Sequence, residues 1–249
     1  MTLHNDLIGA VARREIMAWY QPQLDLSTGL IVAAEALSRW QHPQRGLLAP
    51  SSFIDLAETV DLIGEIGEFM LDDGCECAAA WLAGGTSIEV SVNVSASQLA
   101  NSAFFDRLAA CLLDMPLDPH LITLEITESR VIADRDDAAV RLNRLRSLGV
   151  GVSIDDFGTG FSSIDQVLAL PATELKIDRS LVQGEVRDGA TLMAAVVGLA
   201  HERGLRVVAE GIESASQLEL ARDLGCDRAQ GYLIGMPMPK DELTALLSA

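Results

Sequence analysis

The chain lacks the features that identify several common classes of protein. No apolar run reaches the roughly 20 residues that a membrane-spanning helix needs, and the first residues show no signal-peptide pattern. Basic residues are few: 18 Lys and Arg stand against 36 Asp and Glu, which gives a formal net charge of −18. A chain this acidic is a poor partner for duplex nucleic acid or for an anionic membrane.

Metal-binding cysteines, paired histidines and linkers are also missing. The four cysteines, Cys75, Cys77, Cys111 and Cys226, have no zinc-type spacing and are typical of reduced, structural thiols. None of the four histidines falls at a predicted strand end, so the pattern of a paired-histidine zinc hydrolase is absent. No stretch rich in Pro, Gly or Ser divides the 249 residues, and the sequence therefore predicts a single domain, 1–249.

The sequence does contain a regular alternation of apolar β-like runs and amphipathic helical segments. Strands are predicted near residues 18–24, 30–37, 87–94, 121–127, 151–155, 173–178, 205–210 and 227–232. Helices are predicted near residues 4–16, 51–60, 63–83, 103–114, 135–148, 162–169, 187–203, 214–223 and 240–247.

This alternation predicts βα units and a mainly parallel sheet. A count of about eight strands favours a (β/α)8 barrel over an open, doubly wound sheet. The turn at Ser27-Thr28-Gly29 predicts a hairpin between the first two strands, which makes one strand antiparallel. The expected fold class is therefore α/β, a modified (β/α)8 TIM-like barrel with one antiparallel strand and an N-terminal helix at about 4–16.

Charged and amide side chains stand at or near the ends of these predicted strands. Glu35 is out of place among small apolar residues, and Asp155 and Asp156 close a buried strand, where adjacent like charges are costly without a cation. In a barrel such positions converge on the carboxyl-terminal mouth. Capping of the next helix explains one or two of them, but neither Glu35 nor a lysine on the same face. The set is Glu35, Asn93, Glu125, Glu128, Asp155, Asp156, Lys176, Asp178, Glu210 and Gln230.

Carboxylates and an amide oxygen form a hard, oxygen-only ligand set, which selects Mg²⁺ or Mn²⁺ over softer metals. A shared carboxylate such as Asp155 can bridge two ions about 3.5–4 Å apart, the usual arrangement for in-line attack on phosphorus. A nearby lysine can orient the attacking water. This chemistry favours metal-assisted phosphodiester hydrolysis, and it leaves open another metal-dependent barrel lyase or isomerase.

Several short motifs resemble those of the EAL-domain phosphodiesterases, bacterial enzymes that hydrolyse cyclic di-GMP. They occur in the family's order from about residue 10 to the end of the chain. The motifs are Tyr20-Gln21-Pro22, Glu35-Ala36-Leu37, Asn93-Val94-Ser95, Glu125-Ile126-Thr127-Glu128, Asp155-Asp156-Phe157-Gly158-Thr159-Gly160, Leu175-Lys176-Ile177-Asp178, Ala209-Glu210-Gly211-Ile212-Glu213 and Gln230-Gly231-Tyr232.

The resemblance implies two metal sites and a substrate site. The first ion would be held by Glu35, Asn93, Glu125 and Asp155, and the second by Asp155, Asp156 and Glu210. Lys176 would contact the hydrolytic water, with Asp178 supporting the same loop, and Glu128 would tether the loop at 156–163. The positions that match substrate contacts are Gln21, Leu37, Arg39, Asp178, Glu213 and Gln230.

The activity that the resemblance implies is hydrolysis of cyclic di-GMP to linear pGpG with two Mg²⁺ or Mn²⁺ ions, and Ca²⁺ is expected to inhibit. The alternative is a weakly active or inactive module that binds cyclic di-GMP or a protein partner. The resemblance also implies a homodimer that contacts through the loop and the helix near 162–170. We expect a cytoplasmic chain, either a stand-alone enzyme or the catalytic part of a longer sensor protein.

Overall fold

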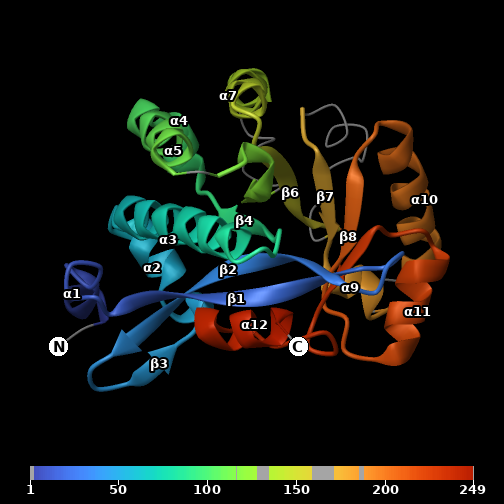
Figure 1. The fold of residues 1–249 in the computed structure, drawn as a ribbon, viewed down its shortest axis with the longest axis horizontal. Coiled ribbons are helices and arrows are strands. Elements are labelled where there is room, and N and C mark those ends of the chain that lie inside the picture. The colour runs from blue at the N-terminus through green and yellow to red at the C-terminus, as the bar shows by residue number, and fades with distance from the viewer. Residues whose placement is uncertain (1–2, 116, 128–134, 159–170, 185–187, 249) are drawn as a thin grey trace.

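The strands close into a barrel in the computed structural model, which describes residues 3–115, 117–127, 135–158, 171–184 and 188–248 (Figure 1). The strand order is β10-β1-β9-β8-β7-β6-β5-β4-β2-β3, and a further pairing of β1 with β2 closes the ring. The barrel strands are β1 (Ile16–Asp25), β2 (Ile31–His42), β4 (Glu89–Asn93), β5 (Ile122–Thr127), β6 (Gly151–Phe157), β7 (Glu174–Ile177), β8 (Arg206–Ala209) and β9 (Arg228–Gln230).

One barrel strand runs against the others, as predicted. β1 pairs antiparallel with both β2 and β9, whereas the pairings from β2 through β4 to β9 are parallel. Two short strands, β3 (Gly46–Leu48) and β10 (Met238–Pro239), lie outside the ring and extend β2 and β1. The predicted modified (β/α)8 barrel is confirmed.

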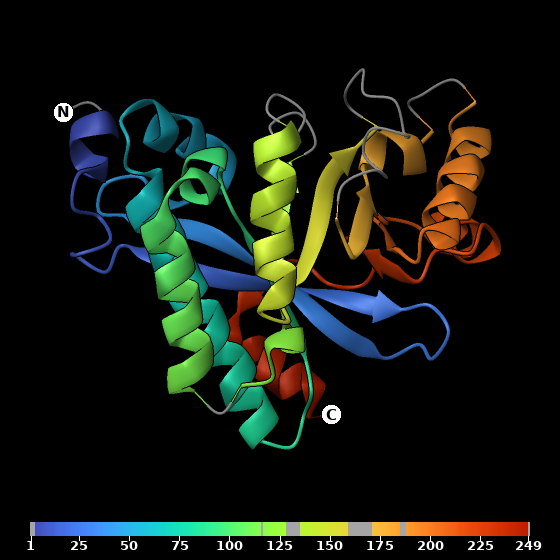
Figure 2. The ribbon, with the colours of Figure 1, turned by 90° about the horizontal axis from the view of Figure 1, so that it is seen from above.

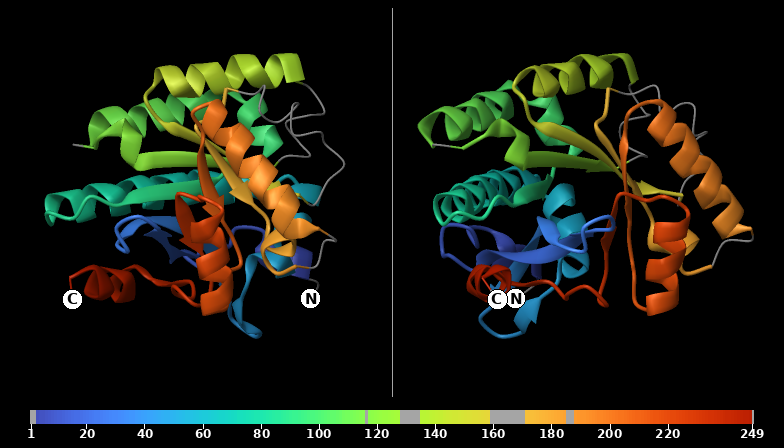
Figure 3. Two further views of the ribbon diagram at one scale, coloured as in Figure 1. Left: turned by 90° about the vertical axis from the view of Figure 1, so that its right-hand side faces the viewer. Right: turned by 45° about the vertical axis from the view of Figure 1, so that its right-hand side comes forward.

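Helices surround the barrel, and Figure 3 shows them on the outside of the strands. Figure 2 shows β1 and β2 crossing the molecule as a long two-stranded ribbon. No helix in the described ranges is both long and apolar enough to cross a membrane. The α-helices are α1 (Leu3–Leu7), α2 (Ile54–Thr59), α3 (Ile63–Ala83), α4 (Ala96–Ala100), α5 (Ser102–Asp114), α7 (Arg135–Ser147), α9 (Arg179–Val182), α10 (Gly189–Glu202), α11 (Ala215–Asp223) and α12 (Lys240–Leu247), and 3₁₀ turns cover Pro50–Ser52 and Pro119–Leu121.

Two sequence predictions are wrong at the N-terminal side. The helix predicted at 4–16 ends at Leu7 because Gly9 and Arg14 adopt positive φ angles of 72° and 57°, which an α-helix does not accommodate. Strand β2 continues beyond residue 37 to His42, so a histidine does end a strand. Its Nε2 lies 3.3 Å from Asp6 Oδ2, beside α1. The helix predicted at 162–169 lies outside the described residues.

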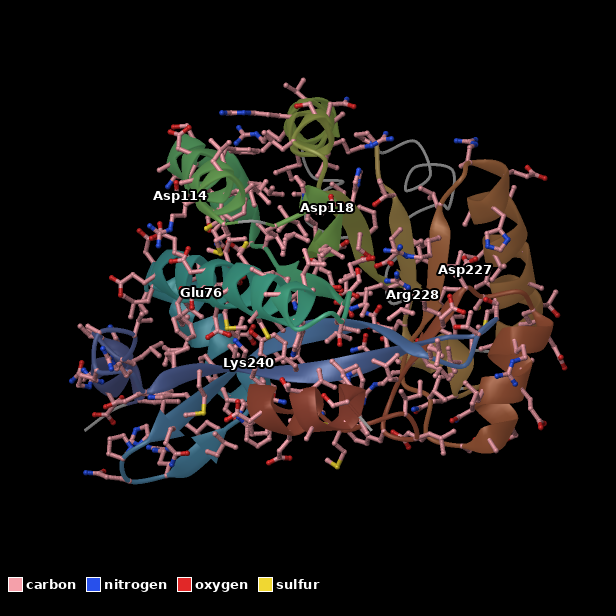
Figure 4. All side chains as sticks on the ribbon, viewed as in Figure 1. Glu76, Asp114, Asp118, Asp227, Arg228 and Lys240 are labelled. Atoms are coloured by element: carbon pink, nitrogen blue, oxygen red, sulfur yellow. The ribbon has the colours of Figure 1, made fainter. Side chains whose placement is uncertain are left out.

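The two faces of the barrel strands differ in chemistry. Outward residues such as Val90, Leu124 and Val152 are fully buried beneath the helices and form the apolar core. Inward residues are largely polar. At the amino-terminal ends of the strands, Arg206 contacts Glu174 and Glu89 at 2.5 and 2.6 Å, and Arg228, labelled in Figure 4, contacts Glu89 at 2.9 Å. This cluster pairs buried charges at one end of the barrel and leaves the other end for the candidate site.

Candidate active site

The carboxyl ends of the parallel strands bring most of the predicted polar residues together. Strand register places Asn93 opposite Glu125, and Gln21 of the antiparallel strand opposite Glu35. Because residues opposite one another in a sheet point to the same face, these side chains share the barrel interior. The inward residues at this end are Gln21, Glu35, Asn93, Glu125, Asp155, Lys176, Glu210 and Gln230.

A bulge in β6 turns two adjacent aspartates toward one site. Ile154 pairs with Leu175 and Phe157 with Ile177, so β6 has one residue more than β7 between these pairs. Asp156 takes a φ of 60°, a left-handed conformation that few residues other than glycine, Asn and Asp adopt. In consequence one carboxylate oxygen from each of Asp155, Asp156 and Glu210 lies within 4.8 Å of the others. A regular strand would have pointed Asp155 and Asp156 to opposite faces.

The ammonium group of Lys176 lies among four carboxylates. Its Nζ is 2.7 Å from Glu210 Oε1 and 2.8 Å from Glu125 Oε2. It is also 3.2 Å from Asp155 Oδ1 and 3.4 Å from Glu35 Oε2. The Lys176 side chain is only 1% exposed, so these contacts lie in a poorly solvated space where charge interactions are strong.

Glutamine and asparagine amides hold Glu35 in place. Asn93 Nδ2 donates to Glu35 Oε1 at 2.8 Å, and Gln230 Nε2 donates to Glu35 Oε2 at 2.6 Å. Gln230 is fixed in turn, because Gln23 Nε2 donates to its Oε1 at 2.9 Å. Sequence reasoning missed Gln23. The signal was its place two residues after Gln21 in a β-run, which puts both amides on one face.

The oxygens left without donors fit a hard cation. Glu125 Oε1 is buried and accepts no hydrogen bond from a described residue, and buried Asp155 Oδ1 has only the ion-pair contact with Lys176 Nζ at 3.2 Å. Buried carboxylate oxygens without donors are costly unless a cation contacts them. Together with the Asp155–Asp156–Glu210 cluster, they match the oxygen ligands that Mg²⁺ and Mn²⁺ prefer.

Burial and mutual repulsion shift the acids of this site. Burial raises the pKa of Glu125, and the neighbouring Glu35 raises it further. Burial also raises the pKa of Glu210, although Lys176 opposes this. For Lys176 burial acts downward, yet Asp155 and Glu125 hold its pKa well above the ordinary value, so the ammonium stays charged. For Glu35 burial acts upward, but Lys176 and the glutamine and asparagine amides that donate to it hold its pKa below the ordinary value. The site therefore pairs a charged ammonium with two acids, Glu125 and Glu210, whose ionisation is favoured only when further positive charge binds nearby.

Asp156 makes metal binding depend on pH. Burial, followed by the charges of Asp155 and Asp178, raises the pKa of Asp156 to about 6. Its carboxyl is thus largely ionised near neutral pH and protonated in weak acid, and a metal ion must displace that proton. We expect the apparent Mn²⁺ affinity to fall at least about tenfold between roughly pH 7 and pH 5, because the raised pKa values of Glu125 and Glu210 add to the effect of Asp156.

Calorimetric titrations in two buffers of different ionisation enthalpy measure this release directly. If Mn²⁺ binds without releasing a proton at the lower pH, Asp156 is not a protonated metal ligand there. An affinity that does not change with pH would contradict the same assignment.

Two cavities adjoin the cluster and share Glu35 and Leu37 in their walls. The larger, of about 410 Å³, extends between α2, α3 and the ends of β4 and β5. Its walls include Ile54, Ile63 and Met70, helical apolar residues that a sequence pattern cannot distinguish from core. The smaller, of about 220 Å³, lies on the other side, and its walls include Gln21, Glu35, Leu37, Asp178, Glu210, Glu213, Gln230 and Tyr232.

The remaining predicted residues differ in where they lie. Asp178 lines the smaller cavity and also caps α9, since its Oδ1 accepts a hydrogen bond from Ser180 N at 2.9 Å. Arg39 lines neither cavity; its guanidinium lies 5.4 Å from the ring centroid of Trp19, farther along the β1–β2 ribbon. Glu128 lies outside the described residues, and so does the loop beyond Gly158.

Gly158 follows the paired aspartates in a conformation that only glycine takes easily. Its φ is 113°, and a Cβ built there would lie 2.5 Å from Cδ1 of the buried Leu181. We expect Gly158→Ala to lower the free energy of unfolding by about 1–3 kcal/mol through strain and contact with Leu181. Gly184→Ala is the matched control, because its φ is also positive but no atom lies within 4 Å. Urea unfolding measures both variants. An equal loss of unfolding free energy in the two would contradict a role for the contact with Leu181.

Comparison with known proteins places these features in context. The EAL domain family model matches residues 4–237. The chain is similar to the "Bifunctional diguanylate cyclase/cyclic di-GMP phosphodiesterase MucR" of Pseudomonas aeruginosa, 42% identical over 248 residues that cover 98% of this chain and 36% of that protein. It is also similar to the "Cyclic di-GMP phosphodiesterase PA2567" of the same organism, 38% identical over 226 residues that cover 90% of this chain and 38% of that protein. The chain thus spans little more than a third of the length of these relatives.

The fold is likewise similar to solved structures. A structure described as "PaMucR Phosphodiesterase, c-di-GMP complex" has a TM-score of 0.92 and 42% sequence identity, and the match covers 98% of this chain and 100% of that one. A structure of the "EAL Enzyme Bd1971" in a form bound to cAMP and cyclic-di-GMP has a TM-score of 0.91 and 31% identity, over 98% of this chain and 68% of that one.

Proposed function

The chain belongs to the EAL domain family, and on that premise we propose that it hydrolyses cyclic di-GMP to linear pGpG with two divalent metal ions. The observation that carries the proposal is the cluster at the carboxyl ends of the strands, where Lys176 contacts four carboxylates and the β6 bulge adds Asp156. Relatives named cyclic di-GMP phosphodiesterases and a related structure with c-di-GMP support the choice of substrate.

In this proposal the acids hold Mg²⁺ or Mn²⁺ in two adjacent sites. The ligands of the first are Glu35, Asn93, Glu125 and Asp155, and those of the second are Asp155, Asp156 and Glu210. When bound there, such ions would lower the pKa of a water molecule and would offset charge on the phosphoryl oxygens.

The protein side chains position the attacking water and the substrate. Lys176 donates hydrogen bonds to the attacking water and to developing negative charge, because its raised pKa keeps it protonated and excludes it as the base. The two cavities flanking Glu35 and Leu37 receive the two halves of the dinucleotide, with Gln21, Glu213 and Gln230 at the smaller one. Arg39 contacts a phosphate at the outer rim, since its planar guanidinium matches phosphate oxygens.

Regulation and cellular setting extend the same proposal. The homodimer is expected to contact through the loop after Gly158 and the helix near 162–170, with Glu128 as the tether to the metal site. Sedimentation measured across the concentrations used for activity tests this arrangement, and a monomer with full activity contradicts it. The chain acts in the cytoplasm, either alone or as the catalytic part of a longer sensor protein.

The direct test is incubation with cyclic di-GMP, with product separation by chromatography. We expect pGpG in Mg²⁺ or Mn²⁺, none after chelation, and little in Ca²⁺, which binds with longer and less regular coordination. The active ions should also raise the melting temperature, because ligands that bind the folded state stabilise it. Binding of cyclic di-GMP without any pGpG would favour the binding module instead.

A further inference from the structure

Lys176 occupies the position between the two proposed metal sites. Strand β7 lies between β6 and β8, so Lys176 projects between Asp155 of β6 and Glu210, which follows β8. Its Nζ is 3.2 Å from Asp155 and 2.7 Å from Glu210, the ligands proposed for the second ion. It is also 2.8 Å from Glu125, a ligand proposed for the first. The ammonium therefore contacts both ligand sets at once.

This ammonium is the positive charge that the described structure provides at the cluster. Among the ion pairs of the described residues, no other lysine or arginine contacts Glu35, Glu125, Asp155 or Glu210. When ionised, these four acids and Asp156 carry five negative charges, of which Lys176 offsets one. The four that remain equal the charge of two divalent ions. Without metal, Lys176 therefore offsets only part of the cluster's negative charge. With two divalent ions bound, Lys176 and the ions offset all of it.

The same oxygens cannot serve both kinds of cation in this geometry. A magnesium ion requires its oxygen ligands at about 2.0–2.1 Å. Glu125 Oε2 and Glu210 Oε1 are instead directed at the Lys176 ammonium, and an ion placed among them would lie within a few ångströms of a like charge. The lysine side chain has a flexible four-carbon stem, so its ammonium can withdraw while remaining nearby.

We propose that Lys176 is the internal counter-ion of the metal-free site, and that divalent ions bind by displacing its ammonium from Glu125 and Glu210. Lys176 then stabilises the acid cluster without metal and weakens metal binding. The displaced ammonium becomes available to the attacking water, so loading of metal and readiness for hydrolysis are linked through one side chain. The proposal rests on the proposed function for its choice of metal ligands.

Calcium titration of Lys176→Met tests the displacement, since methionine keeps the length of the side chain and removes its charge. Calorimetry in Ca²⁺ without nucleotide, in mildly alkaline buffer, should give a dissociation constant about tenfold or more below that of the unmodified chain. The melting temperature in chelator should fall, and its rise on adding Ca²⁺ should be larger. An equal or higher dissociation constant for Lys176→Met would overturn the proposal.

Lys240→Met is the matched control. Lys240 is the chain's other lysine, and Figure 4 labels it at the start of α12. The substitution removes the same charge from the same acidic chain, and Ca²⁺ affinity should not change. A similar gain of affinity in both variants would mean that overall charge, rather than the Lys176 contacts, opposes the metal.

Crystal structures of the unmodified chain with and without Ca²⁺ provide a second test that needs no variant. We expect Lys176 Nζ to leave hydrogen-bonding distance of both Glu125 and Glu210 when metal binds, and retention of either contact beside bound metal would refute the displacement. Both tests use metal without substrate. A chain that behaves as expected here but forms no pGpG would therefore contradict the proposed function alone.

Discussion

Asp155→Ala is expected to abolish hydrolysis of cyclic di-GMP, with a loss of at least about a thousandfold in kcat. Asp155 is the one side chain assigned to both ions, and its buried Oδ1 lies 3.2 Å from the Lys176 ammonium. Removing it takes one ligand from each ion and removes the carboxylate that the two sites share. Glu35→Ala should have a comparable effect, because Asn93 and Gln230 both position that carboxylate.

Asp223→Ala is the control for Asp155→Ala. Asp223 ends α11 on the exposed surface, so the variant loses the same side chain and charge without touching the cluster. Rates of pGpG formation in Mn²⁺ are compared after thermal unfolding has established that each variant is folded. If Asp155→Ala keeps more than about a tenth of the rate, Asp155 is not the shared ligand.

Lys176→Met is expected to lower kcat by about a hundredfold to ten-thousandfold while cyclic di-GMP still binds in Ca²⁺. The ammonium acts on the attacking water and on charge that develops in the transition state, so its loss affects the rate more than substrate binding. This variant should therefore bind metal more tightly and turn over more slowly.

Single-turnover rates and nucleotide titrations in Ca²⁺ separate the two effects. A variant that no longer binds cyclic di-GMP would show that Lys176 acts mainly on the substrate ground state. A variant with an unchanged rate would exclude Lys176 from the chemistry. Lys240→Met serves again as control, and its kcat should equal that of the unmodified chain.

The barrel and the residues at its mouth were predictable because both follow from periodic patterns. Alternation along 87–94 indicates a strand whose inward residues include Asn93, and α3 begins and ends at the predicted residues, Ile63 and Ala83. The carboxyl ends of parallel strands necessarily meet at one end of a barrel, so Glu35, Glu125 and Lys176 were expected to converge. Their contacts in the structure agree with that expectation.

Other features depend on tertiary contacts that no local pattern contains. The bulge that brings Asp155 and Asp156 to one side is a mismatch of register with β7, and a single strand's sequence carries no sign of its partner's spacing. Ile54 and Ile63 line the cavity, but their sequence pattern is the same as that of apolar helix residues in a protein core. Gly9 interrupts an otherwise helical N-terminal pattern, and a sequence pattern does not show that its positive φ angle ends the helix.

Hydrolysis in oxygen-18-labelled water with Mn²⁺ tests the central claim most directly, because the claim is that water activated at this acid cluster opens the phosphodiester ring. Mass spectrometry of the linear dinucleotide should show a single labelled oxygen on its terminal phosphate, and Asp155→Ala should form no such product. Absence of the linear dinucleotide in Mn²⁺, or a product without the label, would contradict the account.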